Sequence, residues 1–174
     1  MTDPVQLFAK ILEKASDHSK WTGAALSKIK TISNGKVGTV GQAFLEELCK
    51  ELKIGCAFPL NARGKRMSQS PWDVEIGGVK FELKTATEDT GGNFQFNHIR
   101  YHRPYDAVLC LGVSPNAIYF GVWSKAHIAT GKAGKMVSME KSANASYKLT
   151  KSPKTLHPIA HFKKEIKKFV STFE

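Results

Sequence analysis

The chain has 174 residues, of which 41% are hydrophobic and 24% charged, and its formal net charge is +11. This composition is typical of one globular domain with a buried core, and the positive charge favours a polyanionic partner, most commonly nucleic acid. The three cysteines are widely spaced, which does not support a disulfide framework or a zinc site. The sequence shows no leader and no apolar run of about 18 residues that would span a membrane, so we expect a soluble, cytoplasmic protein.

The first third of the chain is expected to be mainly helical. Asp3 followed by Pro4 is typical of a helix N-cap with proline at the first position, and an apolar stripe continues to about residue 16. Residues 21–32 predict a second helix. Residues 38–52 predict a stronger third helix, because apolar side chains recur every four residues and Gly55 follows as a stop signal.

Acidic side chains follow the polar face of this third helix, at Glu46, Glu47 and Glu51. One of them is a candidate for an additional metal-site carboxylate. The alternative is a solvated acidic flank that forms ion pairs with Lys50 and Lys53. The sequence leaves both interpretations open.

Residues 61–70 predict a basic loop, because positive charges alternate with small polar residues and no periodicity is present. Its cations are Arg63, Lys65 and Arg66. They are candidates for contacts with the phosphate backbone of a nucleic acid, and the alternative is a solvated loop.

Residues 71–84 predict a β-hairpin, because Gly77 and Gly78 stand between two alternating segments and suit a two-residue turn. The register pairs Ile76 with Val79, Glu75 with Lys80, Val74 with Phe81, and Asp73 with Glu82. One face is then apolar, with Val74, Ile76, Val79, Phe81 and Leu83. The other face carries Asp73, Glu75, Lys80, Glu82 and Lys84.

The expected pair of Asp73 and Glu82 has a chemical consequence. Two directly opposed carboxylates are destabilising unless something offsets their charge. A bridging Mg²⁺ ion is the obvious candidate, since it prefers oxygen ligands and takes one or two protein carboxylates. Lys84 on the same face would polarise a water or stabilise a transition-state phosphate, which suits hydrolysis of a phosphodiester.

Residues 94–103 combine amide, imidazole and guanidinium groups, and the spacing of Phe96 and Ile99 suggests a short helix. Such side chains read base edges or hold phosphates. The candidates for base contacts are Gln95, Asn97, His98 and Arg100, and Arg103 is a candidate for a backbone contact. The alternative is a polar connection between strands with exposed histidines.

The last part of the chain continues with strands and ends with a helix. Residues 106–113 are almost continuously apolar, as in a strand buried on both faces, and residues 118–123 predict an antiparallel partner. Residues 125–150 are weakly patterned and include a glycine- and lysine-containing loop at 130–135. From Pro158 onward an apolar stripe opposes a row of lysines, which predicts a basic amphipathic helix.

The order of these elements, with Asp73, eight residues and then Glu82-Leu83-Lys84, resembles the PD-(D/E)XK nuclease superfamily. The resemblance extends from about residue 38 to residue 123 and is greatest to type II restriction endonucleases and the related mismatch-repair nicking endonuclease. Trp72 separates Pro71 from Asp73, so the literal Pro-Asp dipeptide is absent. The resemblance implies an α/β, restriction-endonuclease-like core, in which a central mixed β-sheet is flanked by helices.

The resemblance also implies the chemistry. Asp73, Glu82 and Lys84 would be catalytic, and Mg²⁺, for which Mn²⁺ could substitute, would be held by the two carboxylates and the Leu83 backbone carbonyl. The family's extra helix glutamate falls at Glu46 by alignment, whereas helical phase brings Glu47 closer to the buried face, so both stay open. The expected substrate is double-stranded DNA, cut by a homodimer because a symmetric site mirrors a symmetric protein.

The expected organisation is one nuclease domain over residues 1–174, with a helical N-terminal part (1–35), a catalytic core (36–125) and a C-terminal loop and basic helix (126–174). Two other functions stay open. One is a structure-specific or repair nuclease of the same fold, or one acting on RNA, because a fold does not fix a substrate. The other is a non-catalytic basic DNA-binding module, in which the carboxylates form salt bridges with Lys80 and Lys84.

Overall fold

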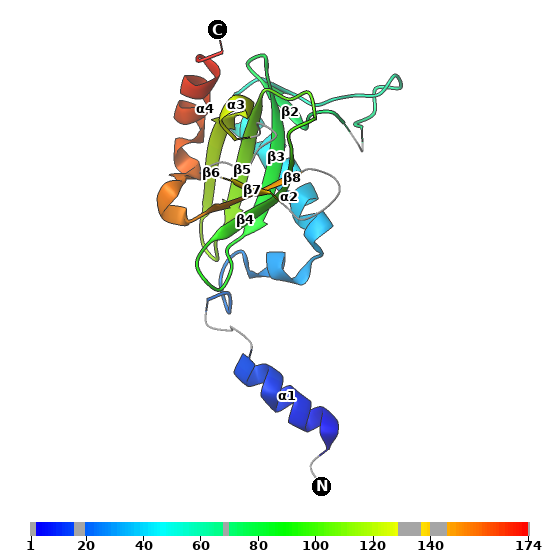
Figure 1. Cartoon of the computed structure of the whole chain (residues 1–174), viewed down its shortest axis with the longest axis vertical. Coiled ribbons are helices and arrows are strands. Elements are labelled where there is room, and N and C mark those ends of the chain that lie inside the picture. The colour runs from blue at the N-terminus through cyan, green and yellow to red at the C-terminus, as the bar shows by residue number, and fades with distance from the viewer. Residues whose placement is uncertain (1–2, 16–19, 68–69, 129–136, 140–145, 174) are drawn as a thin grey trace.

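The centre of the structure, a computed structural model that describes residues 3–15, 20–67, 70–128, 137–139 and 146–173, is a six-stranded mixed sheet (Figure 1). Its strands, in spatial order, are β1 (Cys56–Ala57), β2 (Val74–Ile76), β3 (Val79–Thr87), β5 (Ala107–Val113), β6 (Ile118–Ser124) and β9 (His157–Pro158). The pair β3 and β5 is parallel, and the other neighbours are antiparallel.

Helices cover one face of this sheet and a smaller sheet covers the other. The covering helices are α2 (Asn34–Glu51) and α4 (Phe162–Val170). The other helices are α1 (Pro4–Ala15) and α3 (Lys125–Ile128), and 3₁₀ turns lie at Ser27–Thr31, Pro153–Thr155 and Ile159–His161. The smaller sheet has the order β4 (Phe94–Arg100), β8 (Ser146–Lys151), β7 (Val137–Met139). Helices α2 and α4 share one apolar core with the central sheet, and β4, β7 and β8 share a second.

The double cover explains the sequence of the central strands. Every residue of β5 is buried, as its continuous apolar run predicts, because a strand in a parallel pair is covered on both faces. The predicted antiparallel pairing of β5 with β6 is confirmed. The predicted α/β fold with a central mixed sheet flanked by helices is therefore present.

The predicted hairpin is confirmed at its turn. Gly77 and Gly78 have φ values of +56° and +79°, which residues other than glycine rarely adopt. The observed pairs are Ile76 with Val79, Glu75 with Lys80, and Val74 with Phe81. The ladder ends there: the Asp73 N–H donates to the Phe81 carbonyl (2.8 Å), so the expected direct pairing of Asp73 with Glu82 does not form.

Two elements differ from the sequence-based expectation. Residues 94–100 form strand β4 and not a short helix: Phe94 and Phe96 are buried at a spacing of two, and a register shift lies between Phe96 and Ile99. The spacing of three that suggested a helix is produced by this irregularity in the strand. In the segment 20–32, the observed structure is a turn followed by the 3₁₀ helix Ser27–Thr31.

The N-terminal helix follows its predicted pattern, whereas the C-terminal helix begins at Phe162 and not at Pro158, which lies in β9. In α1 the Val5 N–H donates to Asp3 Oδ1 (3.0 Å), which confirms the predicted cap. Its apolar side chains are exposed, Val5 by 74%, and Figure 1 shows α1 apart from the two sheets. None of the described helices is long and apolar enough to cross a membrane. The loop expected at 130–135 lies outside the described residues.

Candidate active site

A polar cavity lies at the open edge of β3, where the hairpin partner has ended. Strand β2 pairs with β3 as far as Phe81, whereas β3 continues to Thr87 with β5 on its other side. The cavity has a volume of about 200 Å³ and is called the edge cavity below. Its lining residues are Gly38, Gln42, Asp73, Leu83, Lys84 and Arg103.

Asp73 reaches this cavity because the chain departs from the ladder at that residue. Its Oδ2 accepts a hydrogen bond from the Leu83 N–H (2.7 Å), so the side chain occupies the position that the next ladder step would have taken. A carboxylate that caps the backbone of β3 is fixed in place, and it lies beside Leu83, a residue that also lines the cavity.

Glu82 lies next to the edge cavity and not in its wall. Its side chain is almost fully buried, with Oε1 2.7 Å from Lys84 Nζ and Oε2 accepting from the Arg100 N–H (3.3 Å). Burial, together with the charge of Glu82, raises the pKa of the nearby Tyr105 hydroxyl above its usual value, so that hydroxyl stays protonated. A buried carboxylate with a cationic partner and a backbone donor is compensated for the loss of water.

Lys84 links the buried carboxylate to the cavity. It is two residues from Glu82 on the same face of β3, and it lines the edge cavity while paired with Glu82. Arg103 brings a second positive charge to the same cavity, and its Nη1 donates to the Ser70 carbonyl (3.1 Å). The structure thus brings together Asp73, Leu83, Lys84 and Arg103, all of which were candidates from the sequence.

The two glutamates considered as additional ligands form surface ion pairs. Glu46 lies 2.9 Å from Arg66 and 3.6 Å from Lys50, and the hydrogen bond with Arg66 lowers the pKa of this glutamate. Glu47 is 69% exposed and pairs with Lys50 at 2.8 Å. The alternative of an acidic flank paired with lysine therefore describes both of them in this structure.

Helix α2 reaches the edge cavity one turn earlier, through Gly38 and Gln42. Neither residue was a candidate from the sequence, because the expected ligands on this helix were carboxylates. Their spacing of four places them on one helix face, and Glu46 continues that face one turn further along. Helical phase, counted back from Glu46, is the signal that would have found Gln42.

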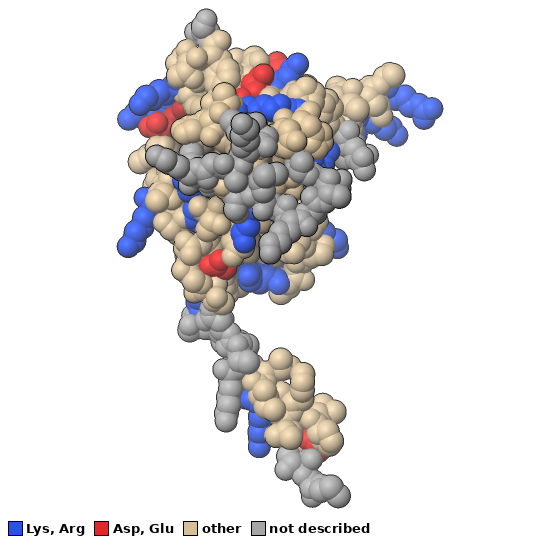
Figure 2. Space-filling model, viewed as in Figure 1, with Lys and Arg blue, Asp and Glu red and all other residues tan. Residues whose placement is uncertain are grey.

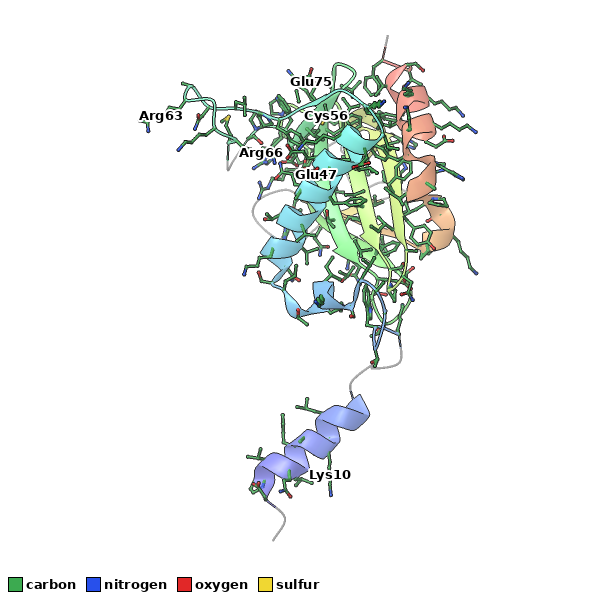
Figure 3. The ribbon with its side chains drawn as sticks, turned by 180° about the vertical axis from the view of Figure 1, so that it is seen from behind. Lys10, Glu47, Cys56, Arg63, Arg66 and Glu75 are labelled. Atoms are coloured by element: carbon green, nitrogen blue, oxygen red, sulfur yellow. The ribbon has the colours of Figure 1, made fainter. Side chains whose placement is uncertain are left out.

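The basic loop projects from the body of the protein, and its three cations differ in their surroundings. Asn61 Oδ1 accepts from the Arg63 and Lys65 N–H groups (2.9 and 3.0 Å), which fixes a tight turn at the tip. Figure 3 shows Arg63 at the outer end of this loop and Arg66 closer to α2. Besides its pair with Glu46, the Arg66 guanidinium lies 3.8 Å from the centre of the Phe58 ring, so it anchors the base of the loop.

A second polar cavity, of about 290 Å³, begins where the edge cavity ends and is called the amide cavity below. It is lined by Asn34, Val37, Thr85, Ala86, Thr87, Asp89, Gln95, Asn97 and His98. The register shift in β4 breaks the alternation of the strand, so the adjacent residues Asn97 and His98 are both exposed, and His98 has φ of +58°. Three of the four candidate base-contact residues thus meet in one cavity. Arg100 does not line it.

The surface carries many more cations than anions. On the face shown in Figure 2, Lys and Arg occur at several places around the body and on the projecting loop, and Asp and Glu are few. This distribution agrees with the net charge of +11 and with a polyanionic partner that contacts an extended surface.

The edge cavity has oxygen donors in its wall, at Asp73 and Leu83, and a further carboxylate, Glu82, buried beside it. Asp73, Glu82 and the Leu83 carbonyl are oxygen donors, the class that Mg²⁺ prefers. Among the described residues, no group of three or more His, Cys, Asp or Glu side chains could hold a metal. Mg²⁺ commonly takes only one or two protein carboxylates and completes its shell with waters and phosphate oxygens.

Comparison with known proteins adds a structural neighbour. The sequence matches no known family profile and no curated protein. Among solved structures, that of a bacterial homing endonuclease is similar: sequence identity is 15%, the TM-score is 0.43, and the alignment covers 69% of this chain and 75% of that chain. At this level of similarity, the chemistry has to be argued from the residues of this chain.

Proposed function

We propose that this chain is a Mg²⁺-dependent endonuclease of the PD-(D/E)XK type that hydrolyses phosphodiester bonds of double-stranded DNA, and that it acts as a sequence-specific type II restriction enzyme. The observation that carries the proposal is the edge cavity. Asp73, Leu83 and Lys84 line it together, and the buried Glu82 is paired with Lys84 at 2.7 Å. An acidic pair with an adjacent lysine at an open strand edge suits phosphodiester hydrolysis.

Each side chain has a role in this chemistry. Asp73, Glu82 and the Leu83 carbonyl would hold the ion. When bound, Mg²⁺ supplies Lewis-acid polarisation of the phosphate and a lowered pKa of bound water. Water adds to phosphorus, the ester P–O bond breaks, and the products are a phosphate monoester and a hydroxyl.

Lys84 and Arg103 would act on the negative charge of the phosphate. Lys84 carries a positive charge in the cavity wall, where it stabilises the charge that develops on the phosphoryl oxygens or orients the attacking water. Arg103 is held by the Ser70 carbonyl and lines the same cavity, so it is suited to position the phosphate.

DNA is the substrate best supported by the surface. The net charge is +11, the projecting loop presents Arg63 and Lys65, and Gln95, Asn97 and His98 meet in the amide cavity beside the edge cavity. Cations of this kind hold the phosphate backbone, while amide side chains read base edges. A symmetric recognition site would be cut by a homodimer, which sedimentation with and without DNA tests.

The test is cleavage of supercoiled plasmid by the full-length protein in Mg²⁺, with Mn²⁺ and EDTA in parallel. We expect a few discrete fragments in either metal and none in EDTA. Asp73→Asn is expected to lower the rate by a factor on the order of 10² or more, because it removes a charged ligand. Glu47→Gln, on the exposed side of α2, is the control and should cut as the unchanged protein does.

One observation favours a second candidate, a non-catalytic DNA-binding module: the Glu82–Lys84 pair is also what a purely structural buried ion pair would look like. DNA that is bound but stays intact in both metals would support this candidate and contradict the nuclease. Cutting that occurs only at nicks, mismatches or junctions would instead indicate a repair nuclease.

A further inference from the structure

The lining residues of the amide cavity and of the edge cavity are neighbours in the sequence on two elements, β3 and α2. On β3 the edge cavity includes Lys84 and the amide cavity begins at Thr85; on α2 they meet at Gly38 and Val37. From Lys84 to Thr87 the strand advances three residues, about 10 Å at roughly 3.3 Å each. From Gln42 back to Asn34 the helix spans eight residues, about 12 Å at 1.5 Å each. The two elements therefore give similar lengths.

This length has a meaning for a DNA strand. Nucleotides follow one another at about 3.4 Å along the helix axis, so a span of about 10 Å corresponds to roughly three nucleotides. A phosphate held in the edge cavity would thus place bases only a few steps away at the amide cavity. Besides Val37, Ala86 and the Asp89 carboxylate, the wall there carries amide, imidazole and hydroxyl groups, which recognise base edges and not phosphates alone.

Gln95 is a side chain of this wall whose orientation is fixed by a charged neighbour. Its Nε2 donates to Asp89 Oδ2 (2.9 Å), while Asp89 Oδ1 accepts from the Asn93 N–H (2.9 Å). These hydrogen bonds, first that from the Asn93 backbone, lower the pKa of Asp89, so its carboxylate only accepts. The amide of Gln95 must therefore turn its NH₂ group to Asp89.

An amide held in this way has a defined preference among bases. One Nε2 hydrogen is used by Asp89, and the second hydrogen and Oε1 remain for a partner. Adenine offers the matching pair in the major groove, a donor at N6 and an acceptor at N7, whereas guanine presents two acceptors. Guanine would set its O6 against Oε1.

We propose that the amide cavity reads an adenine of the DNA substrate through Gln95, which Asp89 holds in the required orientation, within about three nucleotides of the cut. This inference rests on the proposed nuclease function and adds to it the position and identity of one recognised base. Asp89 is a positioning residue, since it acts through Gln95.

The test is sequencing of cleavage ends from a random-sequence duplex pool, cut by the full-length protein in Mg²⁺. We expect adenine at one fixed position within about three nucleotides of the cut. Gln95→Ala should lower the preference for adenine there by about tenfold to a hundredfold, the range for one bidentate contact. Asp89→Ala should weaken the preference less, because it frees the amide to turn over.

A matched control is Thr150→Ala, since Thr150 is the exposed cross-strand partner of Gln95 on β8 and lines neither cavity. It should leave the preference unchanged. Circular dichroism melts of all three variants identify any that fail to fold, and the folded Asp89→Ala variant then tests the same contact if Gln95→Ala does not fold. Preference for adenine that persists in both folded variants, or a recognition site without adenine in this range, would overturn the proposal.

A second measurement separates this inference from the nuclease proposal. Duplexes bound by the protein in EDTA are selected from the same pool and sequenced. Enrichment of adenine that Gln95→Ala abolishes, in a protein that never cuts, would support the amide cavity and contradict the nuclease. If the protein cuts and binds DNA but Gln95→Ala changes no base preference, only the proposed role of the amide cavity would be contradicted.

Discussion

Helix α2 and strand β3 both contribute residues to two very different cavities. The edge cavity, about 200 Å³, takes Gly38 and Gln42 from the helix and Lys84 from the strand. A larger cavity, about 390 Å³ and called the apolar cavity here, takes Val40, Gly41, Phe44 and Thr85 from the same elements. The helix turns about 100° at each residue, so Gly38 and Gln42 reach the edge cavity while Val40, Gly41 and Phe44 line the apolar one.

The comparison shows that the volume of a cavity does not indicate whether its wall is suited to a reaction. The apolar cavity is nearly twice as large, but its wall is made almost entirely of hydrocarbon side chains, including Ile29, Leu111 and Ile118. The edge cavity is small, yet the end of β2 opens the edge of β3 there and admits a carboxylate and two cations. Polar groups and an open backbone edge, and not volume, decide where a phosphate could react.

The largest effect is expected at Lys84, because it lines the edge cavity and pairs with the buried Glu82. Lys84→Ala should lower the rate of DNA cleavage by about 10²- to 10³-fold, the cost of removing one group that stabilises transition-state charge. The measurement is the initial rate of plasmid cleavage in Mg²⁺. Lys80→Ala is the matched control, because Lys80 is on the same face of β3 but lies over the Trp72 ring. Equal losses in both variants would contradict a special role of Lys84.

Two glycines of α2, one at each cavity, should respond oppositely in the free energy of unfolding when replaced by alanine. A Cβ atom on Gly41 would lie 1.9 Å from Thr85 Oγ1, whereas nothing lies within 4 Å of one on Gly38. Gly41→Ala should therefore lower the free energy of unfolding by about 1–3 kcal/mol through overpacking. Gly38→Ala should raise it by up to about 1 kcal/mol, because alanine favours a helix interior. Urea unfolding checks both, and a stable Gly41→Ala variant would show that α2 does not contact β3 this closely.

The next smaller effect, on kcat/KM, tests whether Gln42 or Glu46 is the residue of α2 that acts in the edge cavity. Gln42→Ala should lower kcat/KM for cleavage about tenfold, since it removes one hydrogen-bonding group from the wall. Glu46→Gln should change kcat/KM little, because Glu46 pairs with Arg66 and Lys50. Steady-state kinetics on a short duplex that contains the cut site measures both. A larger loss in Glu46→Gln than in Gln42→Ala would assign the helix contribution to the glutamate.

The smallest effect is expected at the boundary of the apolar cavity. Thr85 Oγ1 is buried and has no hydrogen-bond partner among the described residues. Thr85→Val keeps the shape and removes the unpaired hydroxyl, so it should leave the free energy of unfolding unchanged or raise it by up to about 1 kcal/mol. In the control Thr87→Val, the contact of Thr87 Oγ1 with Lys30 (3.4 Å) is lost, and a slight decrease is expected. A clear loss of stability in Thr85→Val would indicate a bonded hydroxyl.

Much of the fold follows from local sequence. The turn at Gly77-Gly78 and the pairs from Val74 to Phe81 are determined by two glycines and an alternating pattern, because a two-residue turn permits one register. The buried strand β5 and helix α2 follow equally from their apolar runs and spacing. For the site, the same local rules placed Lys84 two residues from Glu82 on one face, where the two now pair at 2.7 Å.

Strand β4 was decided by its neighbours. Its spacing of Phe96 and Ile99 is compatible with a helix, and only pairing with β8, which shifts register between these residues, makes it a strand. Short segments have weak local preferences, so the ladder that a segment can join determines its structure.

The same distinction applies inside the site. The sequence by itself determined that Glu82 and Lys84 share one face of a strand, because the hairpin is local. Only the tertiary structure decided that Asp73 leaves the ladder to hold the Leu83 N–H, that α2 offers Gln42 and not a glutamate, and that Arg66 is held by Glu46 and Phe58. These outcomes depend on where a strand ends and on how a helix is rotated against it, which packing between elements distant in sequence sets and no local pattern records.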